Sequence, residues 1–318
     1  FLSNQKLIER NVTISDKIES LIGQVNPKIV PAATTTRFTA FLSDNTINIT
    51  SFQWDFGDGS GMQTSTTNRI EHKYATTGNY NLNVKAFQGT SELGSATFKI
   101  SVLAPRDAIN STIKEYKDKI TSLETQKNSL PSSYQGKLTS SGFNLEDLNA
   151  EIKTIESSYK ALTQNPSSTD IDYVNLMNEL NALEIPNSIG ISRKSTAALG
   201  FTTDDIALEE IEGLFGESFS SSKEEEYKNE ILSWFVKNLD IKVESKIYSV
   251  RYDTRKEDFL SEFKIRVNPK KELEENIYVI IEKDSNDIDF EGSYNVKEGN
   301  DITGISLDPS EIEEIKFT

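Results

Sequence analysis

The chain has 318 residues, with 50 acidic and 34 basic side chains, a formal net charge of −16, one histidine and no cysteine. Its acidity disfavours binding to nucleic acids and to anionic lipid headgroups, because both require a cationic protein surface. The absence of cysteine excludes disulfides, thiol nucleophiles and cysteine-ligated zinc. No apolar run reaches the length of a membrane span, and the chain length allows about two or three domains.

Residues 1–26 carry a seven-residue apolar repeat. Leu7, Ile14 and Leu21 are spaced by seven, with Ile18 at a complementary position. This spacing predicts a helix with a coiled-coil seam. A single amphipathic helix that packs on its own chain explains the pattern equally well, so both interpretations remain open. The sequence starts at Phe1 and shows neither an initiator Met nor a basic segment ahead of an apolar stretch, so we expect a processed or excised ectodomain.

Residues 27–104 have the pattern of an antiparallel β-sandwich. Phe52, Trp54 and Phe56 alternate with polar residues, so the three aromatic side chains should share one buried face. Asp58-Gly59 then predicts a tight turn, because glycine accepts a positive φ without steric cost. Further alternating strands are expected at residues 78–85 and 96–102.

The order of the motifs in this segment resembles a known family. The motifs are Trp54 to Gly59, His72 with Tyr74, and Gly78 with Tyr80. They closely resemble the PKD (polycystic kidney disease) domain, an immunoglobulin-like module, and the resemblance covers about residues 26–102. It implies an extracytoplasmic setting and a spacer or adhesive role, and it implies no catalysis.

Residues 105–185 should form a helical hairpin or a three-helix bundle with coiled-coil-like seams. Apolar residues recur every seven positions from Ile109 to Leu130, and Pro131 ends the helix that they predict. Ser and Gly are frequent in the segment 132–142, which we therefore expect to be a loop. Two further helices are predicted at residues 145–162 and 170–183.

The remaining chain divides into two predicted parts. Residues 186–238 are expected to be a linker followed by short helices, because Pro, Gly and Ser interrupt the first half of this segment. Residues 239–318 are rich in strand patterns and should form a C-terminal domain similar to a β-sandwich. The segment 263–280 resembles a β-domain that is widespread in secreted archaeal proteins, which indicates an archaeal cell surface.

His72 is the only histidine, so Ser/His/Asp catalysis or histidine-based zinc catalysis would depend on it. It lies on a predicted strand of the sandwich, where the His-x-Tyr motif of the resembled family is structural. No Gly-x-Ser-x-Gly or His-Glu-x-x-His motif is present. We therefore predict no catalytic residue and no enzyme activity.

One acidic segment has the spacing of a calcium loop. Asp287, Asp289 and Glu291 alternate ahead of Gly292, and Glu298 stands where an EF-hand loop has its bidentate ligand. Glutamate at the fifth position and strand-like flanks favour a solvated acidic hairpin. We predict no cofactor, with calcium as the alternative.

Three sequons begin at Asn11, Asn48 and Asn110, and each is a possible glycosylation site if the chain is exported. Asn48 falls in a predicted loop or strand edge of the sandwich, which suits a glycan.

These observations predict a multidomain α+β protein at the cell surface. The predicted function is a non-enzymatic structural or adhesive component of a cell envelope, such as a surface-layer (S-layer), stalk or filament subunit and a possible glycoprotein. Its expected partners are other cell-surface subunits and further copies of itself, with glycans as a further option, but not nucleic acids. The alternative is a carbohydrate- or protein-binding accessory region of a secreted hydrolase.

Overall fold

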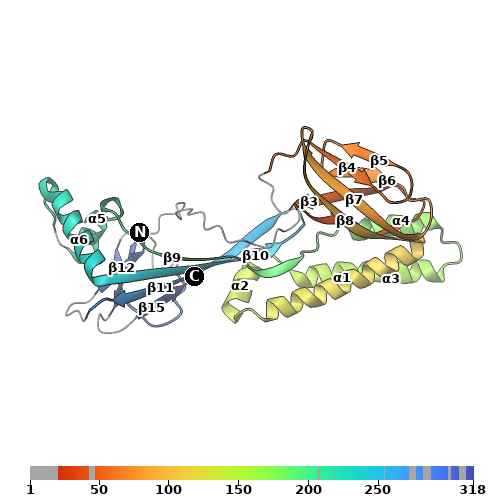
Figure 1. Cartoon of the computed structure of the whole chain (residues 1–318). Coiled ribbons are helices and arrows are strands. Elements are labelled where there is room, and N and C mark those ends of the chain that lie inside the picture. Colours follow the sequence, from red (N-terminus) through yellow and green to blue (C-terminus); the bar gives the residue numbers. More distant parts are fainter. Residues whose placement is uncertain are drawn as a thin grey trace. The chain divides into compact units, whose positions relative to one another are not determined.

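The computed structural model describes residues 21–42, 47–206, 208–216, 218–253, 255–271, 277–281, 288–299, 302–307 and 313–318 (Figure 1). The fold is mixed α+β, as predicted. The described residues divide into two compact units. The sandwich–bundle unit comprises residues 21–189 and 250–257, and the C-terminal unit comprises residues 190–249 and 258–318.

The first part of the sandwich–bundle unit is a two-layer β-sandwich. One sheet has the strand order β1-β3-β6, and the other has the order β2-β8-β7-β4-β5. All their pairings are antiparallel except that of β2 with β8. The strands are β1 (Ile22–Asn26), β2 (Ile29–Pro31), β3 (Thr36–Leu42), β4 (Ser51–Asp55), β5 (Met62–Ser65), β6 (Arg69–His72), β7 (Gly78–Gln88) and β8 (Ser91–Leu103).

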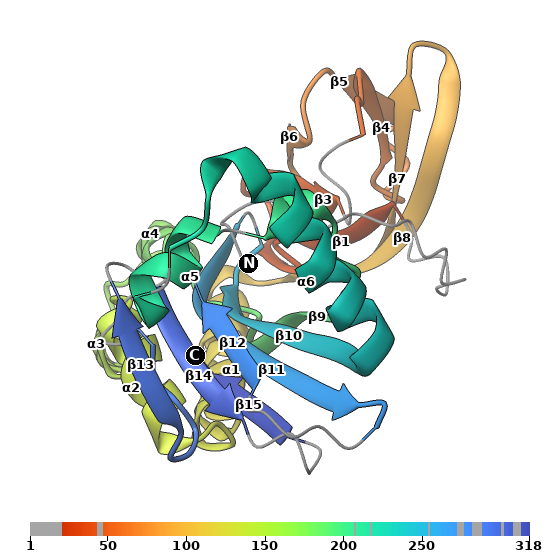
Figure 2. The ribbon, with the colours of Figure 1, turned by 90° about the vertical axis from the view of Figure 1, so that its left-hand side faces the viewer.

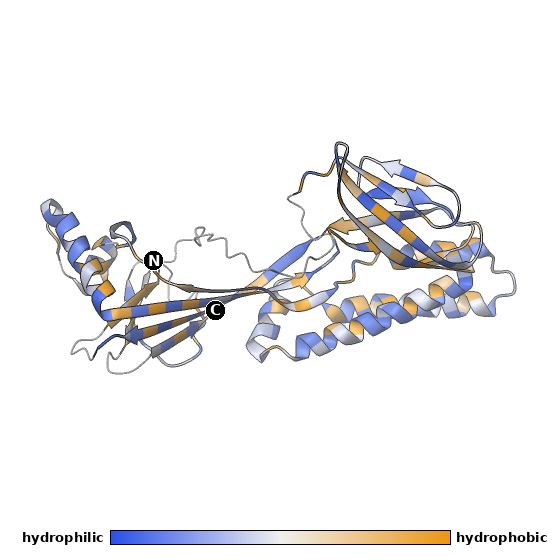
Figure 3. Ribbon diagram, in the orientation of Figure 1, coloured by the Kyte–Doolittle hydropathy of each residue, from blue (hydrophilic) through white to orange (hydrophobic). Residues whose placement is uncertain are grey.

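The predicted alternation in β4 is confirmed. Phe52, Trp54 and Phe56 are buried, whereas Asp55 between them is exposed. Buried residues of both sheets meet in one core, and the hydropathy along β7 alternates accordingly (Figure 3). The indole Nε1 of Trp54 donates a hydrogen bond to Ser65 Oγ at 2.9 Å, so the polar group of this buried side chain is satisfied.

A sharp turn follows Phe56 and requires glycine. Gly57 has a φ of +70°, and a Cβ atom there would lie 2.6 Å from the backbone oxygen of Asn81. The turn brings β4 so close to β7 that only glycine fits. Gly59 also has a positive φ, +84°, but a Cβ atom there would meet nothing within 4 Å.

His72 closes this turn against the core. Its ring stacks on Phe56 with centroids 3.7 Å apart and an interplanar angle of 7°. Its Nε2 donates to the Asp58 carboxylate at 2.8 Å, and its Nδ1 accepts from Gln63 Nε2 at 3.1 Å. The Asp58 carboxylate only accepts, so these contacts require the neutral ring to carry its proton on Nε2. The side chain is 7% exposed.

The predicted helix at residues 1–26 is wrong for its last five residues. Residues 22–26 form β1, which pairs with β3. The apolar side chains Ile22 and Val25 enter the sandwich core, and this tertiary pairing overrides the seven-residue spacing. Residues 1–20, with the rest of the predicted seam and with Asn11, lie outside the described residues.

Three helices pack on one another in the second part of this unit: α1 (Pro105–Asn128), α3 (Leu145–Gln164) and α4 (Asp170–Asn181). Their shared core includes Ile113, Ile155 and Met177. Each of the later helices begins with a polar cap. Asn144 accepts from the first backbone amides of α3, and Thr169 and Asp172 form a capping box on α4.

The loop predicted for residues 132–142 is wrong, because residues Ser132–Ser140 form the helix α2. Tyr134 and Leu138 lie four residues apart on it, and both are buried. Burial of this apolar pair outweighs the low helix propensity of the surrounding serines and Gly136.

The C-terminal unit contains two sheets with the orders β15-β11-β10-β9 and β12-β14-β13 (Figure 2). The pairings of β11 with β15 and of β14 with β12 and β13 are antiparallel. Its core joins residues of both sheets, including Ile241, Ile265 and Ile305. Its helices are α5 (Leu208–Phe215) and α6 (Glu224–Asn238), with 3-10 turns η1 (Thr203–Asp205) and η2 (Ser221–Lys223). Its strands are β9 (Ser188–Ala198), β10 (Leu239–Arg251), β11 (Lys256–Pro269), β12 (Ile277–Ile281), β13 (Asn295–Gly299), β14 (Ile302–Leu307) and β15 (Glu313–Phe317).

The linker predicted from residue 186 is wrong in its first half. Residues Ser188–Ala198 form β9, which is the edge strand beside β10. Pro186 and Gly190 suggested a break, but the β-branched residues Ile189 and Ile191 stand on either side of Gly190, at the two-residue spacing of a strand. The C-terminal β-structure therefore begins before residue 239, the predicted boundary.

The turn at Gly57 predicts a graded stability series. Gly57→Ala should lower the free energy of unfolding by about 1–3 kcal/mol or more, because strain and a backbone clash add together. Gly59→Ala should lower the free energy of unfolding by less, because the added Cβ atom strains the backbone but meets no neighbouring atom. Gly136→Ala, inside α2 with open space at its Cβ, should stabilise the helix by up to about 1 kcal/mol.

These three variants are best compared by urea denaturation followed by Trp54 fluorescence, in a Trp234→Phe background. Trp54 is fully buried and Trp234 is 46% exposed, so the remaining signal reports on the sandwich. Equal losses of unfolding free energy for Gly57→Ala and Gly59→Ala would contradict the close approach of Gly57 to the Asn81 backbone.

The contact between Asp58 and His72 predicts a pH dependence. Burial alone would raise the pKa of Asp58, but hydrogen bonds from Ser60 and His72 together lower it below its ordinary value of 3.8. A lowered folded pKa stabilises the fold above the unfolded pKa, and this stabilisation is lost as the pH falls through the folded value. Asp58→Asn should therefore cost about 1–3 kcal/mol at pH 7.

The difference between wild type and Asp58→Asn should shrink as the pH falls below about 4, the ordinary range of an aspartate pKa. Denaturant melts at several pH values measure it, with the exposed α1 variant Asp118→Asn as the control. A stability difference that stays constant down to pH 2 would show that the Asp58 charge contributes nothing to the free energy of unfolding.

Candidate functional site

The one histidine offers no free nitrogen to a substrate. Both ring nitrogens of His72 are engaged, by Asp58 and Gln63, and the ring is stacked on Phe56. Tyr74 packs edge-on against the same ring and donates its hydroxyl proton to the Phe56 backbone oxygen at 3.2 Å. The structure thus places His72 among groups that hold the turn after β4.

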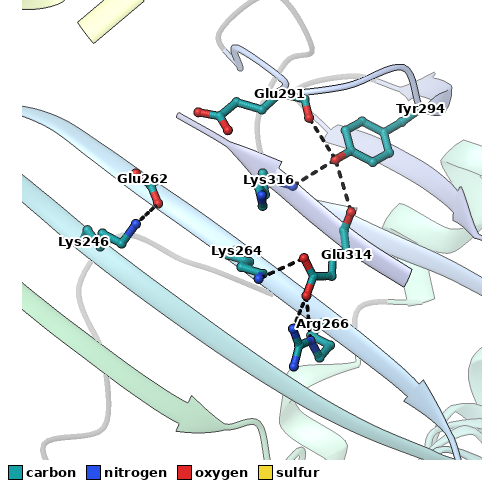
Figure 4. A network of polar contacts seen from close by, with 8 residues as sticks. All are labelled: Lys246, Glu262, Lys264, Arg266, Glu291, Tyr294, Glu314 and Lys316. Atoms are coloured by element: carbon teal, nitrogen blue, oxygen red, sulfur yellow. Dashed lines mark hydrogen bonds and ion pairs between the residues drawn. The ribbon is translucent and has the colours of Figure 1, made fainter. Parts of the chain in front are cut away.

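A network of charges lies on the C-terminal unit (Figure 4). Glu314 of β15 contacts Lys264 at 2.9 Å and Arg266, both on the paired strand β11. Hydrogen bonds from Lys264 and Arg266 lower the pKa of Glu314 to about 2. A carboxylate that stays ionised at neutral pH is a poor general acid, so the network suits strand pairing better than acid–base chemistry.

The residues of the predicted calcium loop are only partly described. Asp289 exchanges two backbone hydrogen bonds with Thr318, and the Glu291 amide donates to the Lys316 oxygen, so this stretch runs beside β15. Asp287 lies outside the described residues. Within the described ranges, no three acidic or histidine side chains gather closely enough to hold a metal ion.

Two of the three sequons lie in described segments. Asn48 is exposed in the loop before β4, and the hydroxyl of its sequon partner Thr50 accepts from the Gly89 amide at 2.8 Å. Asn110 is exposed on the second turn of α1, and its sequon partner Thr112 is buried and donates to the Ala108 oxygen. Asn48 is therefore the more accessible acceptor.

The sandwich–bundle unit contains a polar cleft of about 700 Å³. One wall is the outer face of the sheet β1-β3-β6. In β3, Phe38 and Ala40 point into the sandwich core, while Thr39 and Phe41 line the cleft. The alternation of strand side chains thus gives one sheet both a core face and a cleft face.

The opposite wall comes from the helices. On α1, Thr112, Glu115, Tyr116 and Lys119 line the cleft, and their spacing of three and four residues places them on one helix face. From α4 and the segment after it come Met177, Asn178, Asn181, Leu183, Glu184, Ile185 and Asn187.

The turn between β10 and β11 closes one end of the cleft, and Asp253 anchors this turn. Its carboxylate accepts from Gln24 Nε2 at 3.0 Å and from the side-chain amides of Asn26 and Asn187. Three carboxamides from two distant segments therefore converge on one carboxylate. Charged acceptors form the stronger hydrogen bonds, so this cluster fixes the end of the cleft.

The aromatic and cationic groups of the cleft are held in place. The Arg255 guanidinium carbon lies 3.9 Å from the centroid of the Tyr252 ring, and Arg255 also pairs with Glu184 and Glu257. Burial raises the pKa of Tyr116 to about 12, and Glu115 and Asp253 add to this shift. The Tyr116 hydroxyl therefore keeps its proton throughout the physiological range.

The charges of the cleft lining balance. The four cations Lys28, Arg37, Lys119 and Arg255 are matched by the four anions Glu71, Glu115, Glu184 and Asp253. Arg37 pairs with Glu71 at 2.9 Å across β3 and β6. The net charge of the chain is therefore carried elsewhere on its surface, and the cleft itself is neutral.

No pattern in the sequence predicted this cleft. Gln24 and Asn26 contact Asp253 across 229 and 227 residues of chain, and no local pattern indicates such a pairing. The available signal was weak: polar residues at every second position of β1 marked an outer sheet face, without indicating what lies opposite.

In the described part of the chain, every helix is too short or too polar to cross a membrane.

Comparison with known proteins identifies one domain. Residues 23–102 match the family model of the PKD domain. No match was found among curated proteins.

Two solved structures are similar to the chain. The PKD domain of the human VPS10 domain-containing receptor SorCS2 has 21% identity and a TM-score of 0.22, with 33% of this chain and 92% of that chain covered. A structure of carbohydrate-binding modules from the beta-sandwich super family has 13% identity and a TM-score of 0.23, with 94% and 83% covered. Both TM-scores are below 0.5, so neither bears on the whole chain. The family match and the two-layer sandwich together show that residues 23–102 are a PKD domain.

Proposed function

We propose that the chain is a non-catalytic structural or adhesive component of a cell envelope and acts outside the cytoplasm. Its partners would be other cell-surface subunits or further copies of itself, in a surface layer, stalk or filament. The PKD domain carries this proposal, because such modules are typical of extracellular proteins. An archaeal origin and glycosylation at Asn48 belong to the same proposal.

The engaged state of His72 supports a role without catalysis. A Ser/His/Asp triad needs an imidazole nitrogen directed at a hydroxyl, and a zinc site needs one directed at the metal. In the sandwich both nitrogens face Asp58 and Gln63. A core that holds its only imidazole in this way is suited to serve as a rigid building block.

Contacts through a sheet edge are one route to assembly. β5 is an edge strand of the five-stranded sheet, and its exposed Met62 is an apolar side chain at that edge. Unpaired backbone groups of an edge strand can pair with another chain. A subunit of an envelope layer needs such a surface.

A second candidate function is an accessory binding region of a secreted hydrolase. The cleft favours it, since ligands bind in concave sites where a few placed polar groups fix their orientation. The two functions differ in assembly: an accessory region acts as a monomer, whereas an envelope subunit associates.

The envelope proposal predicts self-association that strengthens with salt. At a net charge of −16, copies repel one another at low ionic strength, and salt screens this repulsion over a Debye length of about 8 Å at 0.15 M. Light scattering after size exclusion, at rising protein and salt concentration, should show oligomers. Met62→Lys should weaken them, with Ile171→Lys on α4 as the matched control.

Strictly monomeric behaviour under all these conditions would favour the accessory region instead. Turnover of a glycoside or peptide panel that disappears on substitution of a single carboxylate would refute both non-catalytic functions.

A further inference from the structure

We infer that the polar cleft of the sandwich–bundle unit is a binding site for a neutral oligosaccharide. The inference rests on the proposed extracellular binding role and adds the site and the chemical class of its ligand. The cleft volume of about 700 Å³ lies within the range of about 300–1,000 Å³ that is usual for ligand sites.

The charge of the cleft selects a neutral ligand. Its cationic and anionic side chains are equal in number, and Arg37 and Arg255 are already paired with carboxylates. The other two cations, Lys28 and Lys119, are matched in number by Glu115 and Asp253, and among the described residues no ion pair fixes their ammonium groups. A phosphate or sulfate ligand would need unpaired cations with a fixed geometry. A ligand rich in hydroxyl groups needs donors and acceptors in similar numbers, which carboxamides and threonine hydroxyls provide.

Two carboxamides of α4 are free to bind such a ligand. Asn178 and Asn181 line the cleft and are exposed, and in the described structure neither side chain makes a hydrogen bond. Each carboxamide offers one acceptor and two donor hydrogens, which matches a pair of adjacent sugar hydroxyls. They lie three residues apart, so both project from the same side of the helix.

The rest of the cleft can hold a sugar ring in place. Phe41 of β3 is half-buried and supplies apolar surface for the carbon-bound face of the ring. The cluster around Asp253 has its hydrogen bonds filled by Gln24 and two asparagines, so Asp253 is a positioning residue that fixes the turn carrying Tyr252. A site whose groups are fixed in advance loses less entropy on binding.

The test uses the full chain and defined oligosaccharides. The probes are tetrasaccharides of mannose, N-acetylglucosamine, glucose and galactose, with a heparin tetrasaccharide as the anionic comparison. Titration calorimetry should show binding of at least one neutral tetrasaccharide. The double variant Asn178→Ala/Asn181→Ala should weaken it by about tenfold or more, since two hydrogen-bonding groups are lost.

Asn175→Ala is the matched control, because Asn175 is an exposed α4 asparagine that does not line the cleft. It should change the affinity by no more than about twofold, as is usual for a surface substitution. Thermal melts should show that all variants fold, as expected for exposed helix positions.

Three results would overturn the inference: no neutral tetrasaccharide binds, only the heparin tetrasaccharide binds, or the double variant binds as tightly as the wild type. Light scattering on the same samples keeps the two proposals apart. Association without saccharide binding would refute the cleft inference alone, and saccharide binding by a strict monomer would refute the envelope assembly alone.

Discussion

The stack of Phe56 on His72 is the contact on which the sandwich depends. It joins the end of β4 to the end of β6 and therefore ties together the two layers of the sandwich. The same imidazole fixes the turn through Asp58, and Gly57 lets that turn approach β7. A buried aromatic core, a charged hydrogen bond and a glycine turn thus all act at one corner of the domain.

The packing of His72 also determines which side chains lie on the outer face of the sheet β1-β3-β6. Because His72 and Phe38 point into the core, their neighbours Glu71 and Arg37 must point outward, and both line the cleft. The outer sheet face then meets a polar face of α1. The alternation of side chains along these strands therefore accounts both for the apolar core of the sandwich and for the polar character of the cleft.

The sequence predicted those parts of the fold that follow from local residue patterns. The alternation of Phe52, Trp54 and Phe56 identified the sandwich, and the PKD resemblance was correct for the same region. The errors at β1, α2 and β9 share a cause. In each, the local composition favoured another structure, and burial of a few apolar side chains against distant strands or helices determined the outcome.

The candidate site was beyond sequence reasoning for a related reason. Its anchor joins β1 to the turn between β10 and β11, more than two hundred residues later, through side-chain amides that are common throughout the chain. Asparagine and glutamine carry no charge or periodic signal that distinguishes a binding residue from a solvated one. Only the folded chain separates the engaged carboxamide of Asn26 from the unengaged carboxamide of Asn178.

The central claim is that the sole imidazole serves the fold and has no free nitrogen. Nitrogen NMR of the full chain tests it directly, because one histidine gives one pair of ring signals without an assignment step. The account predicts that Nε2 carries a proton, which is held by the Asp58 carboxylate, and that this proton exchanges slowly with water. A ring that exchanges rapidly, or that carries its proton on Nδ1, would contradict it.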